Sequence, residues 1–371
     1  MITTTHVNMK GCLVLDNGSV NYYLDPDDWS LKADGTASTL TGADGQVMVE
    51  IPAFWTKRTK VGTITTWEIA DRATSGFNLH PAFVKDGAAV SHRYVGAYTA
   101  CYYDDSDSAY ESGLNEDAHT VDTNDDVLAS VKGVYPILGV TRATCRALAA
   151  NRGAGWRQLD YALWCAINLL YLIEYQTFYS QDELGDGNTK GSYAAPSSSN
   201  QNDSPHTIAG AGDAWGNGST DGTQPSTGAT PGTAYMKYRG IENWFGNGWQ
   251  WVDGINININ ATGDVYVSNT SADFADNTDT NYTLIASDWD TAGNDYITDW
   301  SDIDNYFIAN ANTGGSSSTY VTDYNYGSIN ANRVVVVGGS ANLGAIAGAF
   351  VFRGAAASVD RHRSISARLA R

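Results

Sequence analysis

Short stretches in which apolar and polar residues alternate fill the first hundred positions. The segment DGQVMVEIPAFW alternates at Val47, Val49 and Ile51, which predicts a half-buried strand that ends at Pro52. An Asn-Gly pair in DNGSVNYYL is a hairpin signal, and TITTWEIA and YVGAYTACYY are typical of further strands. The N-terminal part is therefore predicted to consist of short strands and turns.

Two stretches in the middle of the chain change to the helical period. Thr141 can cap a helix over RATCRALAAN, and Gly153 can end it. A second helix is predicted from about Leu159 to Tyr175, because apolar residues follow the helical repeat there. Its apolar run, YALWCAINLLYLI, has 13 residues and is too short to span a bilayer. We therefore expect a buried helix and no membrane insertion.

The second half returns to strands separated by long polar segments. Trp249 and Trp251 lie two positions apart on one face of a predicted strand, and RVVVVGG predicts a last strong strand. Residues 180–232 and 261–320 are rich in small polar residues, and no regular element is predicted in either. The expected fold class is α+β, with two helices, short antiparallel strands and long loops.

Residues 104–127 form an acidic and polar segment, which we interpret as a solvated loop. A calcium-binding loop is the alternative, because carboxylates are the ligands that calcium prefers. The regular ligand spacing with a central Gly is missing from this segment, so the solvated loop is favoured.

Charge is distributed unevenly along the chain. The 371 residues carry a net charge of −19, which argues against a general binder of nucleic acid or anionic membranes. Residues 352–371 carry about +4, and the rest of the chain carries −23. The arginines of this segment can pair with the acidic body or form a locally basic surface. They are Arg353, Arg361, Arg363, Arg368 and Arg371.

Residues that usually carry metal or redox chemistry are few and scattered. The four cysteines form no CxxC pair, and none lies after Cys165. The start has no signal peptide, so buried free thiols are expected rather than disulfides. The histidines lack ligand spacing and are expected to be surface or satisfied core residues: His6, His80, His92, His119, His206 and His362.

The last residues, GAFVFRGAAASVDRHRSISARLA, follow neither the helical nor the strand period. Gly, Ala and Phe recur in a regular way, and Val, Arg, Asp and His fill the positions between them. This pattern suggests a fixed scaffold with variable positions.

Three landmarks precede or enter this ending in a set order. They are GWRQLDYALWCA, GNGWQWVDG and RVVVVGGS, followed by a terminal ARLA. This order resembles the C-type lectin fold in its formylglycine-generating-enzyme-like branch, over roughly residues 130–371. The ending is similar to the variable region of proteins diversified by retroelements, such as the phage tropism determinants. The resemblance implies an N-terminal β segment, 1–50, and a ligand-binding domain, 51–371, whose variable region covers about 333–371.

In that family a reverse transcriptase copies a template with mutations at adenines, so Asn codons become varied residues on a constant scaffold. Such codons cannot give Lys, Glu, Gln, Trp or Met; residues 338–371 contain none of these, although 301–337 lack them too. The constant positions, here called frame residues, would be Gly338, Gly339, Gly344, Gly348, Phe350, Phe352, Gly354, Ile365, Ala367, Arg368 and Leu369. The positions between them, here called gap residues, would form one contiguous, largely exposed ligand-binding surface: Leu343, Ile346, Val351, Arg353, Ala355, Ala356, Val359, Asp360, Arg361, His362 and Ser364.

The function implied by the resemblance is a hypervariable receptor-binding protein, a phage or prophage tail-associated adhesin. Its partner would be a host-surface protein or glycan, with a homotrimer or other virion proteins as further contacts and no nucleic acid. The expected location is the virion, or the host-cell cytoplasm before assembly. A structural or surface-display protein of the same fold, without a receptor role, is the alternative.

An oxidoreductase like the formylglycine-generating enzyme is a further alternative. That chemistry needs a pair of cysteines in the C-terminal part, which this chain lacks, so no enzyme is expected. Calcium-dependent lectins of this fold carry an acidic-Asn-Pro or Gln-Pro-Asp tripeptide followed by Trp-Asn-Asp, and neither occurs here. No cofactor is expected, apart from a structural calcium ion that the acidic loops could hold.

Overall fold

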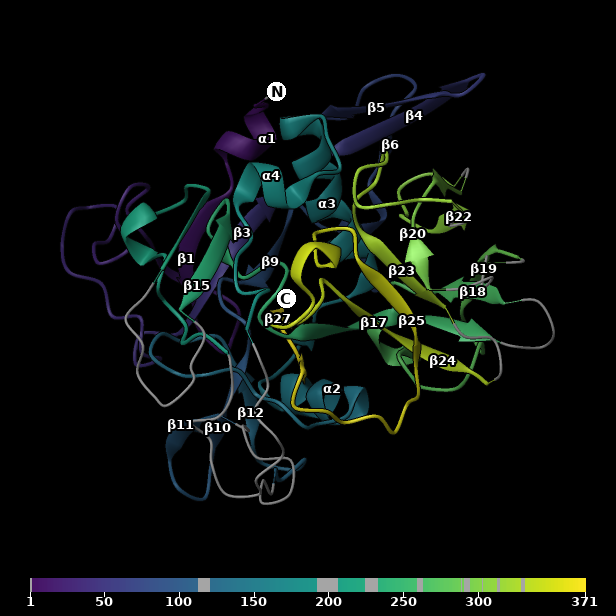
Figure 1. The fold of residues 1–371 in the computed structure, drawn as a ribbon. Coiled ribbons are helices and arrows are strands. Elements are labelled where there is room, and N and C mark those ends of the chain that lie inside the picture. The colour runs from purple at the N-terminus through teal and green to yellow at the C-terminus, as the bar shows by residue number, and fades with distance from the viewer. Residues whose placement is uncertain are drawn as a thin grey trace.

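The computed structural model shows a mainly β protein with a small α component (Figure 1). The described residues hold four α-helices, and most of the remaining regular structure is strand. The structure describes residues 2–112, 121–191, 206–223, 233–258, 263–287, 289, 294–301, 303–311, 314–327 and 331–371.

The first large sheet combines the N-terminal strands with the end of the chain. All its neighbouring strands are antiparallel. The strand predicted at Val47, Val49 and Ile51 is present, but both of its faces are buried, because Met48 packs into a second core cluster. The strand order is β13 (Arg157–Gln158), β27 (Leu369–Ala370), β9 (His92–Gly96), β3 (Gln46–Pro52), β1 (Lys10–Val14) and β2 (Val20–Tyr23).

The second large sheet contains most strands of the C-terminal region. One of them is β17 (Trp249–Asn258), which carries Trp249 and Trp251 and is here called the tryptophan strand. Its strands are antiparallel except that β23 runs parallel to β25, and β26 (Ile365–Ser366) runs parallel to β17. The strand order is β19 (Thr283–Ala286), β18 (Asp264–Val267), β17 (Trp249–Asn258), β24 (Arg333–Val337), β25 (Phe352–Ala356), β23 (Tyr324–Gly327) and β20 (Asp295–Tyr296).

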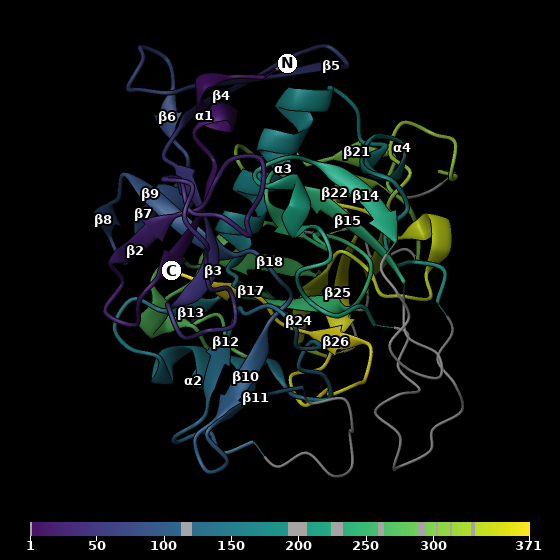
Figure 2. The same cartoon turned by 90° about the vertical axis from the view of Figure 1, so that its left-hand side faces the viewer.

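The two predicted helices are confirmed. Helix α2 (Arg142–Asn151) is capped by Thr141, whose hydroxyl accepts a hydrogen bond from the Thr144 amide at 3.1 Å. Helix α3 (Tyr161–Tyr175) is buried along its first twelve residues and runs through the middle of the molecule in both views (Figures 1 and 2). Two short helices were not predicted: α1 (Thr4–Val7) and α4 (Ser180–Leu184).

Smaller sheets and 3-10 turns surround these parts. Three sheets have three strands: β11 (Ala109–Glu111), β10 (Cys101–Asp104) and β12 (Val127–Ala129); β14 (Thr220–Thr223), β15 (Ala234–Tyr238) and β16 (Ile241–Glu242); β5 (Ile64–Ala70), β4 (Trp55–Val61) and β6 (Asn78–Leu79). Two pairs are β7 (Val84–Lys85) with β8 (Ala88–Ala89), and β21 (Asp299–Trp300) with β22 (Ala309–Ala311). The 3-10 turns are η1 (Pro81–Phe83), η3 (Asp213–Trp215), η4 (Ser271–Asp273) and η5 (Gly344–Ile346).

Several of these elements correct the sequence-based expectation. The segments 180–232 and 261–320 were predicted to lack regular elements, yet they contain α4, β14 and the strands β18 to β22. Their strands are two to four residues long, too short to show a clear alternation. Residues 192–205, 224–232 and part of 104–127, namely 113–120, lie outside the described residues.

The N-terminal β segment packs as part of the whole molecule. Strand β3 runs across the expected boundary at residue 50, and it pairs with β9 on one side and β1 on the other. Leu13 and Trp29 belong to the same core cluster as Leu163 and Ile255. One continuous core therefore joins the first 50 residues to the rest of the described chain.

Buried ion pairs fasten α2 to the tryptophan strand. The Arg142 side chain is fully buried and donates to the carboxylate of Asp276 at 2.6 Å and to the Ile255 carbonyl at 2.8 Å. Arg146 donates to both Asp253 and Asp276. Because each of these carboxylates meets two arginines, the buried charges compensate one another and fix the position of α2.

In the part of the chain that the structure describes, none of the helices combines the length and the apolar character needed to cross a membrane.

Candidate ligand-binding face

The frame residues are buried, as a fixed scaffold requires. Ten of the eleven are buried, and only Gly344 at the start of η5 is partly exposed. Gly338 and Gly339 have φ angles of 84° and 83°, in the left-handed region that favours glycine. A Cβ on Gly348 would collide with the carboxylate of Asp323, and one on Gly354 would collide with Ile257 and Trp289. Each of these glycines is therefore needed where it stands.

The gap residues differ from this pattern in their exposure. Eight of the eleven are exposed or half-buried. Val351, Ala356 and Ser364 are buried, so the predicted exposure is wrong for these three. Val351 and Ala356 pack into the second core cluster, and the Ser364 hydroxyl lies 2.6 Å from Nδ1 of His362. The remaining eight are Leu343, Ile346, Arg353, Ala355, Val359, Asp360, Arg361 and His362.

The structure places these residues in three groups along the course of β25. Leu343 directly precedes η5 and Ile346 is its last residue; this turn precedes the strand, and Arg353 and Ala355 lie on β25 itself. The other four lie in the loop 357–364, which follows the strand and returns to β26; Figure 1 shows the helical turn and this loop, both yellow, at opposite ends of β25.

Arg353 belongs to a row of paired residues that crosses four strands. Trp251 on β17 pairs with Val336 on β24, Val336 pairs with Arg353 on β25, and Arg353 pairs with Tyr326 on β23. Directly paired residues project from the same side of a sheet. The indole of Trp251 is covered and donates to the Val140 carbonyl at 3.0 Å, whereas Arg353 and Tyr326 are only half-buried. The face therefore opens from β25 towards β20.

Three tyrosines extend this open part of the face and were missed by the sequence analysis. The ring centroids of Tyr296 and Tyr324 are 5.1 Å apart, those of Tyr324 and Tyr326 are 4.7 Å apart, and Tyr326 lies 5.8 Å from Trp249. All three tyrosines are half-buried. The alternation in DYNYG was a usable signal, because residues two apart share one face of a strand. We call these three residues the tyrosine row.

The charges of this face are not neutralised locally. Neither Arg353 nor Arg361 forms an ion pair with any residue that the structure describes. Burial raises the pKa of Tyr326 to about 12, and the positive charge of Arg353 opposes part of this rise. Arg368 is different, because it is buried and donates to neutral oxygen atoms. Of the two readings of the arginines, a locally basic surface fits Arg353 and Arg361.

The loop 357–364 is held by hydrogen bonds within the loop and to neighbouring segments. The Asp360 carboxylate accepts a hydrogen bond from the Ala357 amide at 2.9 Å, and the His362 carbonyl accepts one from Gly139 at 3.2 Å. Asn277 donates to the Ser358 hydroxyl at 2.6 Å. Asp360 therefore shapes the loop, while Val359, with 77 % of its surface exposed, points into solvent.

Residues that could hold a metal gather only once among those described. Single carboxylate oxygens of Asp104, Asp107 and Glu111 lie within 4.8 Å of one another on the β10–β11 hairpin, inside the acidic segment. One oxygen of Asp104 already accepts hydrogen bonds from the Ser106 amide, the Ser106 hydroxyl and the Asp107 amide. The hairpin corrects the expectation of a loop for these residues, and His119 lies outside the described part.

The thiols and imidazoles of the described residues do not assemble a site. All four cysteines are free and buried, as expected, and burial raises the pKa of Cys101 to about 12. His6 and His80 are core residues; Nε2 of His6 lies 2.8 Å from the Leu170 carbonyl, and Nδ1 of His80 accepts from the Ala82 amide.

The geometry thus defines a mainly β protein whose C-terminal region presents a half-open, basic and aromatic face on a rigid sheet. No protein-family model matches the chain, and a comparison with curated proteins likewise gave no match.

Proposed function

We propose that this protein is a hypervariable receptor-binding protein, a phage or prophage tail-associated adhesin diversified by a retroelement. In this proposal the chain has a C-type lectin fold of the formylglycine-generating-enzyme-like branch. Its ligand is a protein or glycan on the host surface, bound by the exposed gap residues together with the tyrosine row.

The observation that carries this proposal is the separation of frame and gap residues in space. Along one continuous stretch, ten of eleven frame residues are buried, whereas eight of eleven gap residues reach the surface. Exposed side chains can be replaced at little cost in stability, while buried ones cannot. A binding face on such a scaffold can change without loss of the fold.

The three landmarks of the resemblance also meet in the structure. GNGWQWVDG and RVVVVGGS contribute the paired strands β17 and β24, and the terminal ARLA pairs with GWRQL through β27 and β13. Landmarks that are far apart in sequence thus form adjacent parts of one scaffold. This arrangement supports the proposed resemblance to the C-type lectin fold, which covers roughly residues 130–371.

The chemistry of the face suits recognition of a macromolecule. Tyr and Arg are the residues that most often dominate binding energy at protein interfaces. Here the tyrosine row lies beside Arg353, and Leu343, Ile346 and Val359 supply partly exposed apolar surface. The two arginines without ion pairs favour a ligand with acidic or aromatic groups.

A triple replacement tests the proposal. Arg353→Ser, Arg361→Ser and His362→Ser together should abolish or strongly weaken binding to host cells without a change in melting temperature. As a control, Lys60→Ser with Arg72→Ser also removes two full positive charges, at exposed positions outside the sheet that carries the face, and should leave binding intact. Undiminished binding of the triple variant would refute the proposed site, and equal loss in both variants would show a mere charge effect.

The gene neighbourhood gives an independent test of the retroelement. We expect a reverse-transcriptase gene and a near-copy of the sequence that encodes the variable region, with Asn codons at the exposed gap residues. A near-copy whose adenines instead fall at frame residues such as Phe350 and Gly354 would contradict the assignment.

A further inference from the structure

A pocket lies at the edge of the second large sheet that is opposite to the candidate ligand-binding face. It has a volume of about 490 Å³ and is formed where β18 and the edge strand β19 meet the segment 79–84. The candidate ligand-binding face lies on β25, β23 and β20, and β17 and β24 separate it from β18 and β19 in the same sheet. The pocket therefore shares no lining residue with that face.

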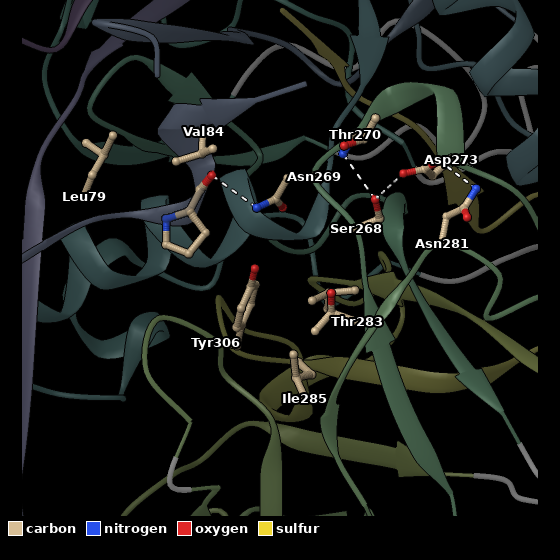
Figure 3. Close-up of a pocket in the computed structure, with 12 residues that line it drawn as sticks. Leu79, Val84, Ser268, Asn269, Thr270, Asp273, Asn281, Thr283, Ile285 and Tyr306 are labelled. Carbon is tan, nitrogen blue, oxygen red and sulfur yellow. Dashed lines mark hydrogen bonds between the residues drawn. The ribbon is translucent and has the colours of Figure 1, made fainter. Parts of the chain in front are cut away.

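The polar groups of the pocket come mainly from one segment of chain and are held in place by one another. The Asp273 carboxylate accepts hydrogen bonds from the Ser268 hydroxyl at 3.2 Å and from Nδ2 of Asn281 at 3.1 Å. The Thr270 amide donates to the same Ser268 hydroxyl, and Nδ2 of Asn269 donates to the Pro81 carbonyl at 3.3 Å. Figure 3 shows these side chains around the upper rim of the pocket.

An aromatic ring stands opposite this rim. Tyr306 rises between the two sides of the pocket with its hydroxyl directed towards Asn269 (Figure 3). The ring centroids of Tyr306 and Tyr161 are 5.8 Å apart with an angle of 5° between the planes, so the Tyr306 ring is supported by stacking. Leu79, Val84 and Ile285 add apolar surface beside it.

The charge of the lining limits the kind of ligand. Among the lining residues only Asp273 is charged, and none is basic. The guanidinium of Arg157 donates to the Asn269 carbonyl at 3.4 Å, but it is paired with Asp86 at 2.7 Å. An anionic ligand would therefore meet a carboxylate without a compensating cation, at a cost in free energy.

We propose that this pocket binds a neutral sugar residue. Amides and hydroxyls can both donate and accept hydrogen bonds, and a carboxylate accepts two, which matches adjacent hydroxyl groups on a sugar ring. A rigid aromatic ring and aliphatic side chains match the apolar C–H face of the same ring. The volume is in the range of small-molecule sites and exceeds what one ring needs.

The experiment is ligand-observed saturation-transfer NMR on the full chain with D-glucose, D-galactose, D-mannose and N-acetyl-D-glucosamine, each at millimolar concentration. At least one sugar should give a transfer signal, whereas inorganic phosphate, followed by ³¹P line broadening, should not bind. Asp273→Asn and Thr283→Val, both nearly isosteric, should each weaken the binding of the sugar about tenfold, because the first replaces a charged acceptor oxygen by an amide NH2 and the second removes a hydroxyl group.

Matched controls carry the same chemical changes elsewhere. Asp27→Asn and Thr66→Val lie at exposed positions that do not line the pocket and should leave the affinity unchanged. Thr283 is exposed on an edge strand, so Thr283→Val keeps the test open even if Asp273→Asn destabilises its turn. The inference is overturned if none of the four sugars binds, if phosphate binds as well as they do, or if both lining variants bind like the parent. The triple variant of the ligand-binding face should bind the sugar normally, which separates this inference from the proposed function.

Discussion

Gly354 and Ala355 are neighbours on β25 whose side-chain positions have opposite surroundings. A Cβ on Gly354 would lie 2.6 Å from Cη2 of Trp289 and would also collide with Ile257. Ala355, by contrast, is only half-buried. The difference between a frame residue and a gap residue is therefore a difference in available space.

We expect Gly354→Ala to lower the free energy of unfolding by about 1–3 kcal/mol, because the core must shift to admit one methyl group. Ala355→Ser should change it by less than about 0.5 kcal/mol. Urea unfolding of both variants beside the parent measures the difference, and equal stabilities would contradict the assignment of frame and gap.

Asp323 lies beneath this face, and its protonation state affects the stability of the fold. It is buried, its Oδ2 accepts a hydrogen bond from the Phe350 amide at 2.6 Å, and burial raises its pKa from 3.8 to about 8. Between pH 4 and pH 8 the folded protein keeps this proton while the unfolded chain has lost it. The contribution of Asp323 to stability is therefore present at pH 4 and is lost as the pH rises towards 8.

The variant Asp323→Asn cannot titrate and should lack this loss. Relative to the variant, the parent should lose stability on the order of 5 kcal/mol between pH 4 and pH 8, as expected for a shift of roughly four pKa units. Urea unfolding of both proteins across this range is the measurement. Parallel pH profiles of the two proteins would show that Asp323 does not hold its proton.

At the scale of elements, the segment from η5 to β25 is held by aromatic packing. Phe350 is buried, and its ring centroid lies 4.8 Å from Phe178 and 5.1 Å from Phe307. Trp249, Trp251 and Ile365 are also buried.

Replacing Phe350 by Ala should cost about 3–5 kcal/mol, because it leaves a cavity under the ligand-binding face. Val359→Ala, a truncation at an exposed gap residue, serves as the comparison and should cost less than about 0.5 kcal/mol. Thermal or chemical unfolding measures both; a small effect at Phe350 would mean that this packing does not support the face.

The β10–β11 hairpin carries the acidic cluster of Asp104, Asp107 and Glu111. One Asp104 oxygen accepts three hydrogen bonds from Ser106 and Asp107, and these bonds by themselves can hold the turn of the hairpin. We expect the melting temperature to be the same in excess EDTA and in millimolar calcium. A rise with calcium that Asp107→Asn abolishes would instead establish a structural ion there.

On the scale of the whole molecule, Arg368 joins the two large sheets. It is fully buried and donates to Oε1 of Gln250 at 2.7 Å, to the Gly96 carbonyl at 2.9 Å and to the carbonyls of Glu242 and Asn243, both at 2.8 Å. Gln250 belongs to the tryptophan strand and Gly96 to the N-terminal sheet. The segment that follows the loop 357–364 is thus a structural link between the two sheets.

Arg368→Met should lower the free energy of unfolding by about 3–5 kcal/mol, because four buried acceptors lose their donor. Arg361→Met makes the same change on the exposed loop and should be nearly neutral. Differential scanning calorimetry of the two variants decides the matter, and two similar melting temperatures would contradict a linking role for Arg368.

The sequence alone determined the parts that depend on local pattern. The helical repeat located α2 and α3, the alternation located β3 and β17, and the run of four valines located β24. The recurring Gly, Ala and Phe residues separated most frame residues from gap residues. These signals are local because the side chains of one helix or strand face the core at a fixed period.

Only the tertiary structure decided which strands are neighbours and what each covers. The pairing of β27 with β9 and β13 brings together residues hundreds of positions apart, and no local pattern specifies it. The burial of Val351 and Ala356 and the proximity of Tyr326 to Arg353 likewise depend on which segments pack over and beside β25. Which strands pair and which side chains are covered depend on long-range contacts. The sequence therefore indicated the segment that carries the candidate site, whereas the fold decided which of its residues are exposed and which residues lie beside them.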